Sequence, residues 1–142
     1  MQLTRFQKVA LSISGVIALA IGFFILLVPH AFYASYGITL GQDPNLLSEL
    51  RAPGAGLAAL GAIMLAGLVR AAITPTALAV ALAVYLAFPL GRIVSIAVDG
   101  VPSGSVVGAL AIEIIIAGLL LAAFGRRRSK NSGNERFVGL PG

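Results

Sequence analysis

Apolar residues run through this chain in four long stretches, and the polar residues gather between them. The stretches cover residues 9–28, 52–69, 76–98 and 106–124. Each is close in length to the about 20 apolar residues that a helix needs to cross the hydrocarbon core of a bilayer. The connections are short, apart from one at residues 30–50. The pattern predicts an all-α integral membrane protein, a four-helix antiparallel bundle.

The composition agrees with a membrane protein. Of the 142 residues, 58% are hydrophobic and 11% are charged, whereas charged residues make up about 25% of a soluble domain. We expect a transmembrane domain over residues 1–125 and a basic, disordered cytoplasmic tail over residues 126–142. The chain has one histidine and no cysteine, so we expect no metal and no other cofactor.

The net charge of +5 is unevenly distributed along the chain. With four crossings, one side of the membrane keeps Arg51 alone, and the other side holds the remaining basic residues outside the spans. The positive-inside rule then places both termini in the cytoplasm of a bacterial cell, with the spans in the inner membrane. A basic tail of this kind is typical of a topology anchor on anionic lipid, so we expect membrane lipid as a partner and no nucleic acid. The residues on the basic side are Arg5, Lys8, Arg70, Arg126, Arg127, Arg128, Lys130 and Arg136.

Small residues recur every four positions in each span. That interval places them on one face of a helix, where they allow a neighbouring helix to approach closely. We expect these faces to be helix contacts. They are Ser14, Ala18 and Gly22 in the first span, Gly54, Ala58, Ala62 and Ala66 in the second, Ala79, Ala83, Ala87 and Gly91 in the third, and Ser105, Ala109, Glu113 and Ala117 in the fourth.

Arg92 and Glu113 are charged residues within apolar spans. A charge at the centre of a bilayer costs about 2.5–3.5 kcal/mol on insertion scales unless it is paired or hydrated. At 1.5 Å per residue, Arg92 lies roughly 10 Å from Asp99 and Glu113 roughly 12 Å from Ser105, where the two spans are joined. Because the depths match in antiparallel neighbours, we expect an ion pair between Arg92 and Glu113.

A wider polar cluster is expected around this pair, in the extracytoplasmic half of the bundle. Ser95 and Asp99 share a helix face with Arg92, and Glu49 and Arg51 lie at the mouth of the second span. The cluster could serve only to fix the helix register, or it could form a polar pocket for a ligand or a protonatable acid in a pathway. The candidate site residues are Arg92, Glu113, Asp99, Glu49, Arg51 and Ser95.

Residues 30–50 are expected to form a loop whose aromatic side chains lie at the membrane interface. Asp43 before Pro44 has the pattern of an N-cap followed by proline in the first turn. It predicts a short helix over residues 44–51, with Pro53 bending its junction with the second span. No serine, histidine or tyrosine is spaced to form a nucleophile system with Glu113 or Asp99, so we expect no enzyme.

The polar residues within and beside the spans resemble those of the bacterial DUF4345 family. The likeness covers most of residues 47–124 and implies a small four-helix integral membrane protein without an assigned function. More remotely, the layout is similar to that of DoxX-like four-helix membrane proteins. The chain departs from the family pattern at Pro53, where a second glycine is typical. The residues that carry the resemblance are Glu49, Leu50, Arg51, Ala52, Gly56, Leu90, Gly91, Arg92, Ser95, Asp99, Gly100, Pro102, Ser103 and Glu113.

Two classes of function stay open at this point. The first is the binding or passage of a small molecule or lipid at the polar site. The second is a structural or accessory role, as a homo-oligomer or as a subunit of a larger membrane complex. In that case the buried charges would only hold helix register, and the small-residue faces would contact the partner.

Overall fold

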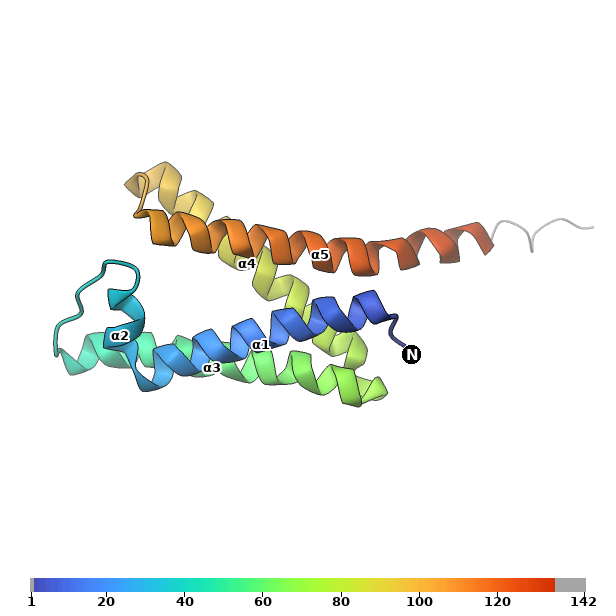
Figure 1. Cartoon of the computed structure of the whole chain (residues 1–142), viewed down its shortest axis with the longest axis horizontal. Helices are drawn as coiled ribbons and strands as arrows, with labels where there is room; N and C mark the ends of the chain where they lie inside the picture. Colours follow the sequence, from blue (N-terminus) through green and yellow to red (C-terminus); the bar gives the residue numbers. More distant parts are fainter. Residues whose placement is uncertain (1, 135–142) are drawn as a thin grey trace, which may run out of the picture.

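Four long helices that alternate in direction make up the fold. They are α1 (Arg5–Leu27), α3 (Pro44–Val69), α4 (Thr74–Asp99) and α5 (Gly104–Asn134), with the short α2 (Pro29–Ala34) after α1 and a 3-10 turn, η1 (Ala71–Ile73), before α4. This computed structural model describes residues 2–134, and only the backbone of residues 126–134. The start of α1 and the far end of α5 lie at one end of the molecule, and α2 lies at the other (Figure 1).

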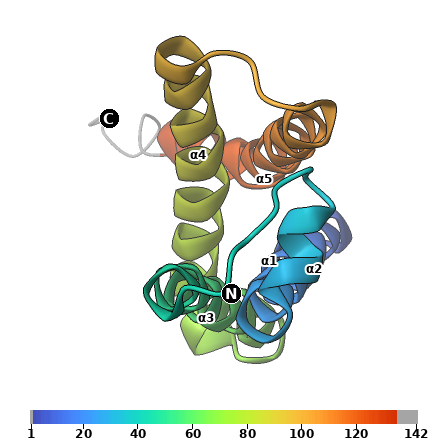
Figure 2. The ribbon, with the colours of Figure 1, turned by 90° about the vertical axis from the view of Figure 1, so that its left-hand side faces the viewer.

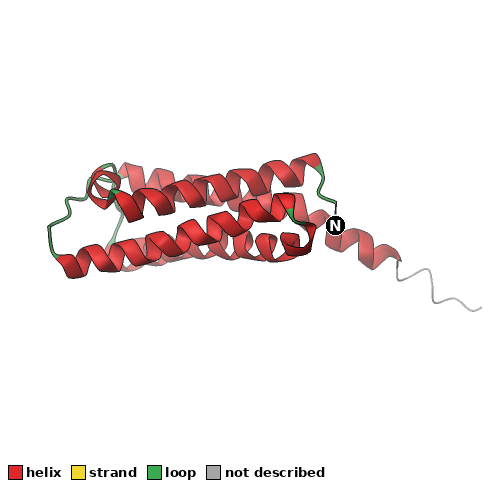
Figure 3. Ribbon diagram, turned by 90° about the horizontal axis from the view of Figure 1, so that it is seen from below, coloured by secondary structure: helices red, strands yellow, loops and turns green. Residues whose placement is uncertain are grey.

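All four long helices are long and apolar enough to cross a membrane. The predicted all-α four-helix bundle is therefore confirmed, and within the described part of the chain the helices are joined by loops without any strand (Figure 3). Three boundaries differ from the predicted spans by four residues or more. α1 begins at residue 5 instead of 9, α3 begins at residue 44 instead of 52, and α5 continues past residue 124 to Asn134. The rest of the predicted disordered tail, residues 135–142, lies outside the described residues.

Capping residues set the early starts of α1 and α3. Thr4 and Gln7 form a capping box, in which each side chain accepts a hydrogen bond from the other residue's backbone N–H, and this satisfies donors at the helix start. The predicted N-cap of α3 is confirmed, because Asp43 accepts a hydrogen bond from the N–H of Asn45 at 3.0 Å. Pro53 lies inside α3, so the predicted short helix and the second span form one continuous helix.

Helices α1 and α3 pack with their backbones in close contact. A Cβ atom on Gly22 would lie 2.3 Å from the backbone nitrogen of Ala58, and one on Gly61 would lie 2.4 Å from that of Leu19. Ser14, Ala18 and Gly22 of α1 are buried, so the first small-residue face is a helix contact as predicted. On α3 the prediction holds at Gly54 and Ala58, but it is wrong at the exposed Ala62, where Gly61 takes the contact instead.

The predicted contact face of the third span is wrong. Its small residues, Ala79, Ala83, Ala87 and Gly91, are all exposed. The buried face of α4 is formed by residues that precede these by about two positions, roughly 200° around the helix. It consists of Thr74, Ala77, Ala81, Val84, Tyr85 and Pro89. In Figures 1 and 2, α4 crosses obliquely from the α1–α3 layer to α5.

Two polar contacts attach α1 to the other half of the bundle. The Gln7 Nε2 donates to the carbonyl of Ala123 at 2.9 Å, which joins α1 to α5 at the end that holds the N-terminus. Midway along, the Tyr85 hydroxyl donates to the carbonyl of Ser14 at 2.7 Å and joins α4 to α1. Both donors are buried, so each contact satisfies a group that would otherwise be unpaired in an apolar interior.

The close α1–α3 contact predicts opposite effects for two glycine-to-alanine changes. Gly22→Ala places a methyl group against backbone atoms, which cannot yield as a side chain can, and should lower the free energy of unfolding by about 1–3 kcal/mol. Gly91→Ala is the matched control, because its Cβ would have no neighbour within 4 Å and alanine favours a helix. Reversible unfolding in mixed micelles measures both. Equal effects of the two changes would contradict the contact.

Candidate functional site

Arg92 and Glu113 form the predicted ion pair between α4 and α5. The Arg92 Nε lies 2.9 Å from Oε2 and 3.1 Å from Oε1 of Glu113, and the Arg92 Nη2 lies 3.0 Å from Oε1. This two-pronged geometry matches a planar guanidinium to a carboxylate. The side chains keep 28% and 14% of their surface exposed, so the pair is not packed on all sides.

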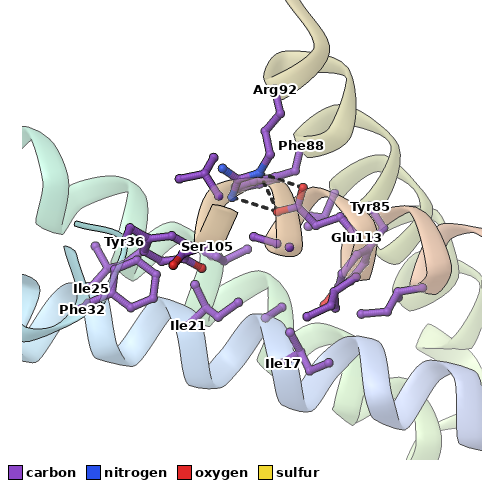
Figure 4. Close-up of a pocket in the computed structure, with 18 of the residues that line it drawn as sticks. Ile17, Ile21, Ile25, Phe32, Tyr36, Tyr85, Phe88, Arg92, Ser105 and Glu113 are labelled. Carbon is purple, nitrogen blue, oxygen red and sulfur yellow. Dashed lines mark hydrogen bonds and ion pairs between the residues drawn. The ribbon is translucent and has the colours of Figure 1, made fainter. Parts of the chain in front are cut away.

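The pair forms part of the wall of a cavity of about 650 Å³. Figure 4 shows Arg92 and Glu113 on one side of this space and the isoleucines of α1 across it. Apart from the pair and a few hydroxyl groups, the lining is apolar. It consists of Ile17, Ala18, Ile21, Ile25, Phe32, Tyr33, Tyr36, Ile38, Leu57, Val84, Tyr85, Phe88, Arg92, Ser105, Val106, Gly108, Ala109, Ile112, Glu113 and Ile116.

The segment around α2 lines one end of the cavity, which the sequence did not predict. Pro29 begins α2 instead of only ending the first apolar run. The ring of Phe32 lies 5.2 Å from the rings of both Tyr33 and Tyr36. Ser103, in the α4–α5 connection, donates to the carbonyl of Tyr36 at 3.1 Å. The predicted interface aromatics therefore also line the cavity. The signal for this was a proline placed to start a helix, followed by aromatics four positions apart.

Burial raises the pKa of the Tyr33 hydroxyl above its usual value, and the nearby charge of Arg92 offsets only part of this effect. The sign follows from the chemistry, since burial disfavours the charged phenolate and a positive charge favours it. The hydroxyl therefore keeps its proton at neutral pH and can donate a hydrogen bond. α2 lies outside the long membrane-spanning helices, so this donor sits at the mouth of the bundle.

The other predicted members of the polar cluster do not join the pair. Ser95 donates to Asp99 at 3.0 Å on the exposed surface of α4. Arg51 donates to the carbonyl of Leu26, which belongs to the last turn of α1, where a cation also meets the negative end of the helix dipole. Glu49 is exposed. Arg51 and the Ser95–Asp99 pair are each satisfied by a group nearer than the ion pair.

A second, shallower groove lies on the outer side of the pair. It has a volume of about 540 Å³ and shares Phe88, Arg92 and Val106 with the cavity. Its remaining lining is contributed by α4 and by the connection to α5. These residues are Ala87, Gly91, Ser95 and Pro102. Ser95 is therefore near Arg92, as predicted, but on the outer face and not in the cavity.

The expected absence of a metal and of any other cofactor stays a prediction. In the part of the chain that the structure describes, no group of histidine, cysteine, aspartate and glutamate side chains could hold a metal ion. His30 instead lies with its Nε2 3.1 Å from the carbonyl of Gly41, within the connection between α2 and α3. This contact gives the lone histidine a structural role at the loop.

Residues 6–124 match the family described as "Domain of unknown function (DUF4345)". The chain belongs to this family. The match covers all four membrane-capable helices up to Phe124 and includes both residues of the ion pair. No curated protein and no solved structure matches the chain. Membership of DUF4345 therefore assigns the chain to a family but assigns it no activity.

The ion pair predicts a non-additive double-mutant cycle. Arg92→Leu and Glu113→Leu should each lower the free energy of unfolding, by somewhat less than the about 3–5 kcal/mol typical of breaking a fully buried pair, since both side chains are partly exposed. The double change should recover much of the loss, because it removes both charges and leaves no unpaired charge in the bundle. Unfolding in mixed micelles measures the cycle. Single losses that simply add would show that the two side chains do not interact.

Proposed function

We propose that this protein binds a small amphipathic molecule of lipid type in the cavity between α1, α4 and α5. The observation that carries the proposal is a cavity of about 650 Å³ with apolar walls and a single ion pair. Ligand sites of about 300–1,000 Å³ typically combine apolar walls with a few polar groups that orient the ligand. Both features coincide in this cavity, which is also less open than the groove on the outer side of the pair.

The volume itself favours an occupant. A space of about 650 Å³ is large enough to take up most of the surface of a small ligand. Water would fill the polar end but gains little against isoleucine and leucine side chains. A molecule with an apolar body and a polar head satisfies both parts of the lining.

The exposure of the pair favours binding over a purely structural role. An ion pair that only fixes helix register gains most when packed side chains exclude water and hydrogen bonds satisfy its remaining atoms. Here the side chains keep 28% and 14% of their surface and face the cavity. The pair still stabilises the α4–α5 contact, so both roles can coexist. We propose binding or passage without catalysis, because the charged groups of the lining already engage each other.

A second candidate function is that of an accessory subunit or homo-oligomer. It is favoured by the exposed small-residue face of α4, formed by Ala79, Ala83, Ala87 and Gly91. The α1–α3 contact shows how this chain uses such residues for close helix packing, so a helix of a partner could pack there in the same way.

We further propose a bacterial inner-membrane location with both termini in the cytoplasm, based on the positive-inside rule. A reporter active only in the cytoplasm should be active when fused at the C-terminus. It should be inactive when fused after Leu40, in the connection between α2 and α3. Activity after Leu40 would overturn this orientation. The α2 end of the cavity would then lie on the cytoplasmic side of the membrane instead of the extracytoplasmic side.

Filling the cavity should abolish ligand retention. A Cβ on Gly108 would meet nothing within 4 Å, and Gly108 lines the cavity. Gly108→Phe therefore places a ring in the space that a ligand would occupy. Gly118→Phe is the matched control on the same helix, because its Cβ is equally unobstructed and it is absent from the cavity lining. Native mass spectrometry of protein released from its own membrane should show a bound small molecule that only the first change removes.

The same measurement separates the two candidates. If no small molecule is retained, or if both glycine variants retain it equally, binding in the cavity is wrong. A second protein subunit that survives Gly108→Phe but is lost in Gly91→Leu would favour the accessory role instead. The fold of each variant is checked by its unfolding transition, so that loss of ligand is not confused with loss of structure.

A further inference from the structure

The two charges of the cavity wall cancel each other. Arg92 and Glu113 are the charged residues of the lining, and they are joined by three hydrogen bonds of 2.9–3.1 Å. The remaining polar side chains of the lining are hydroxyls, on Tyr33, Tyr36, Tyr85 and Ser105. A ligand that enters the cavity therefore meets a wall without net charge, although it contains a full cation.

A charged ligand would disturb this balance. An anion that approached Arg92 would bring a second negative charge beside Glu113, and like charges repel strongly where little water screens them. A cation would find Glu113 already bound to two nitrogens of Arg92 and would leave a net positive charge on the wall. In either case the cavity gains an uncompensated charge within an apolar surrounding, which is costly.

An uncharged acceptor can bind without breaking the pair. A guanidinium has five N–H donors, and Arg92 uses Nε and Nη2 for Glu113. Its Nη1 donates no hydrogen bond within the part of the chain that the structure describes. The hydroxyls of Tyr33, Tyr36 and Ser105 are likewise without a hydrogen bond to any described residue. These four groups can all donate, so together they suit oxygens that accept.

The hydroxyl donors without a partner gather toward one end of the cavity, whereas the apolar lining extends along its whole length. Figure 4 shows Tyr36 and Ser105 near the end lined by α2, and Ile17 at the other end of the α1 wall. Tyr85, which is farther in, already donates its hydroxyl to the carbonyl of Ser14. An occupant is therefore expected to place its oxygens toward α2 and its apolar body toward the middle of the bundle.

We propose that the ligand is an uncharged amphiphile whose head carries acceptor oxygens, such as a carbonyl, an ester or a glycerol ester, on an apolar chain. This inference rests on the proposed function and names its ligand class. The cavity selects against fatty-chain anions and cations because its only cation is already neutralised by Glu113. The acceptor oxygens bind Arg92 Nη1 and the free hydroxyls while the ion pair stays intact.

A competition among three probes with the same dodecyl-length chain tests the charge class. The probes are 1-lauroylglycerol, which is uncharged, dodecyl phosphate, which is an anion, and dodecyltrimethylammonium, which is a cation. Wild-type protein in nanodiscs is exposed to an equal mixture at low mole fraction and examined by native mass spectrometry. For each probe, only the part of the retention that is lost in Gly108→Phe is counted as binding in the cavity. Adsorption to the membrane surface is the same in both proteins and is thereby excluded. We expect 1-lauroylglycerol to exceed each charged probe on the order of tenfold, or 1.4 kcal/mol.

Glu113→Gln should reverse the preference. Glutamine keeps the shape and one acceptor oxygen but removes the negative charge, so Arg92 becomes an uncompensated cation at the wall. Dodecyl phosphate should then be retained best. Asp99→Asn is the matched control, because it removes one negative charge from an exposed residue of α4 that is not in the cavity lining and should leave the wild-type order unchanged.

The outcomes separate the two levels of the proposal. Wild-type preference for dodecyl phosphate or for the cation in the cavity would overturn the charge inference while leaving cavity binding in place. An equal shift in Glu113→Gln and Asp99→Asn would also overturn it, since a general charge effect would then explain the order. If no probe is retained in a manner sensitive to Gly108→Phe, both the charge inference and the proposed function fail. The wild-type competition stands on its own if Glu113→Gln does not fold.

Discussion

The structure depends on one constraint: a polar group inside a bilayer has to find its partner within the protein. Lipid tails offer no hydrogen bonds, so each unpaired group costs free energy that a helix bundle cannot spare. Among the described residues, no buried side-chain nitrogen or oxygen lacks a hydrogen-bond partner. Gln7 and Tyr85 meet backbone carbonyls on other helices, and Arg92 meets Glu113. These contacts decide which helices are neighbours.

The two halves of the bundle are held together by different forces. α1 and α3 pack through glycine and alanine, and their backbones come so close that an added methyl group at Gly22 would meet main-chain atoms. α4 and α5 join this pair through buried apolar side chains and through polar contacts, of which Gln7 with Ala123 and Tyr85 with Ser14 are the ones to α1. Close packing excludes space between helices, whereas isolated hydrogen bonds do not. The cavity lies between α1, α4 and α5, away from the close contact of α1 with α3.

Much of this arrangement could be predicted from the sequence because it follows from helix geometry alone. The apolar lengths gave the four spans, and the rise per residue placed Arg92 and Glu113 at one depth. The face of α4 could not be predicted in this way. Ala79 and Ala83 allow close packing as well as Ala77 and Ala81 do, and in lipid neither face is favoured by burial. The buried face of α4 includes Tyr85, whose hydroxyl donates to the carbonyl of Ser14. This hydrogen bond favours the face with Ala77 and Ala81 over the face with Ala79 and Ala83.

The other members of the predicted polar cluster lie apart from the ion pair for a related reason. Counting residues gives the depth of a residue in the bilayer, but it does not give the direction of its side chain near the end of a helix. A polar side chain there binds the partner that lies nearest. Arg51 reached the last turn of α1, and Asp99 stayed with Ser95 on its own helix. The fold-back of α2 over the cavity also escaped prediction, since six residues carry too little periodicity to define a face.

The position of the pair at a boundary gives it a consequence beyond holding α4 to α5. Arg92 lines the inner cavity and also the outer groove, together with Phe88 and Val106. These three side chains therefore separate a space inside the bundle from one on its lipid-facing side. The guanidinium is paired to Glu113 through Nε and Nη2, and only a competing anion would displace this carboxylate. A neutral head group on Nη1 would leave that pair in place, so these three side chains could keep the cavity and the groove apart while the cavity is occupied.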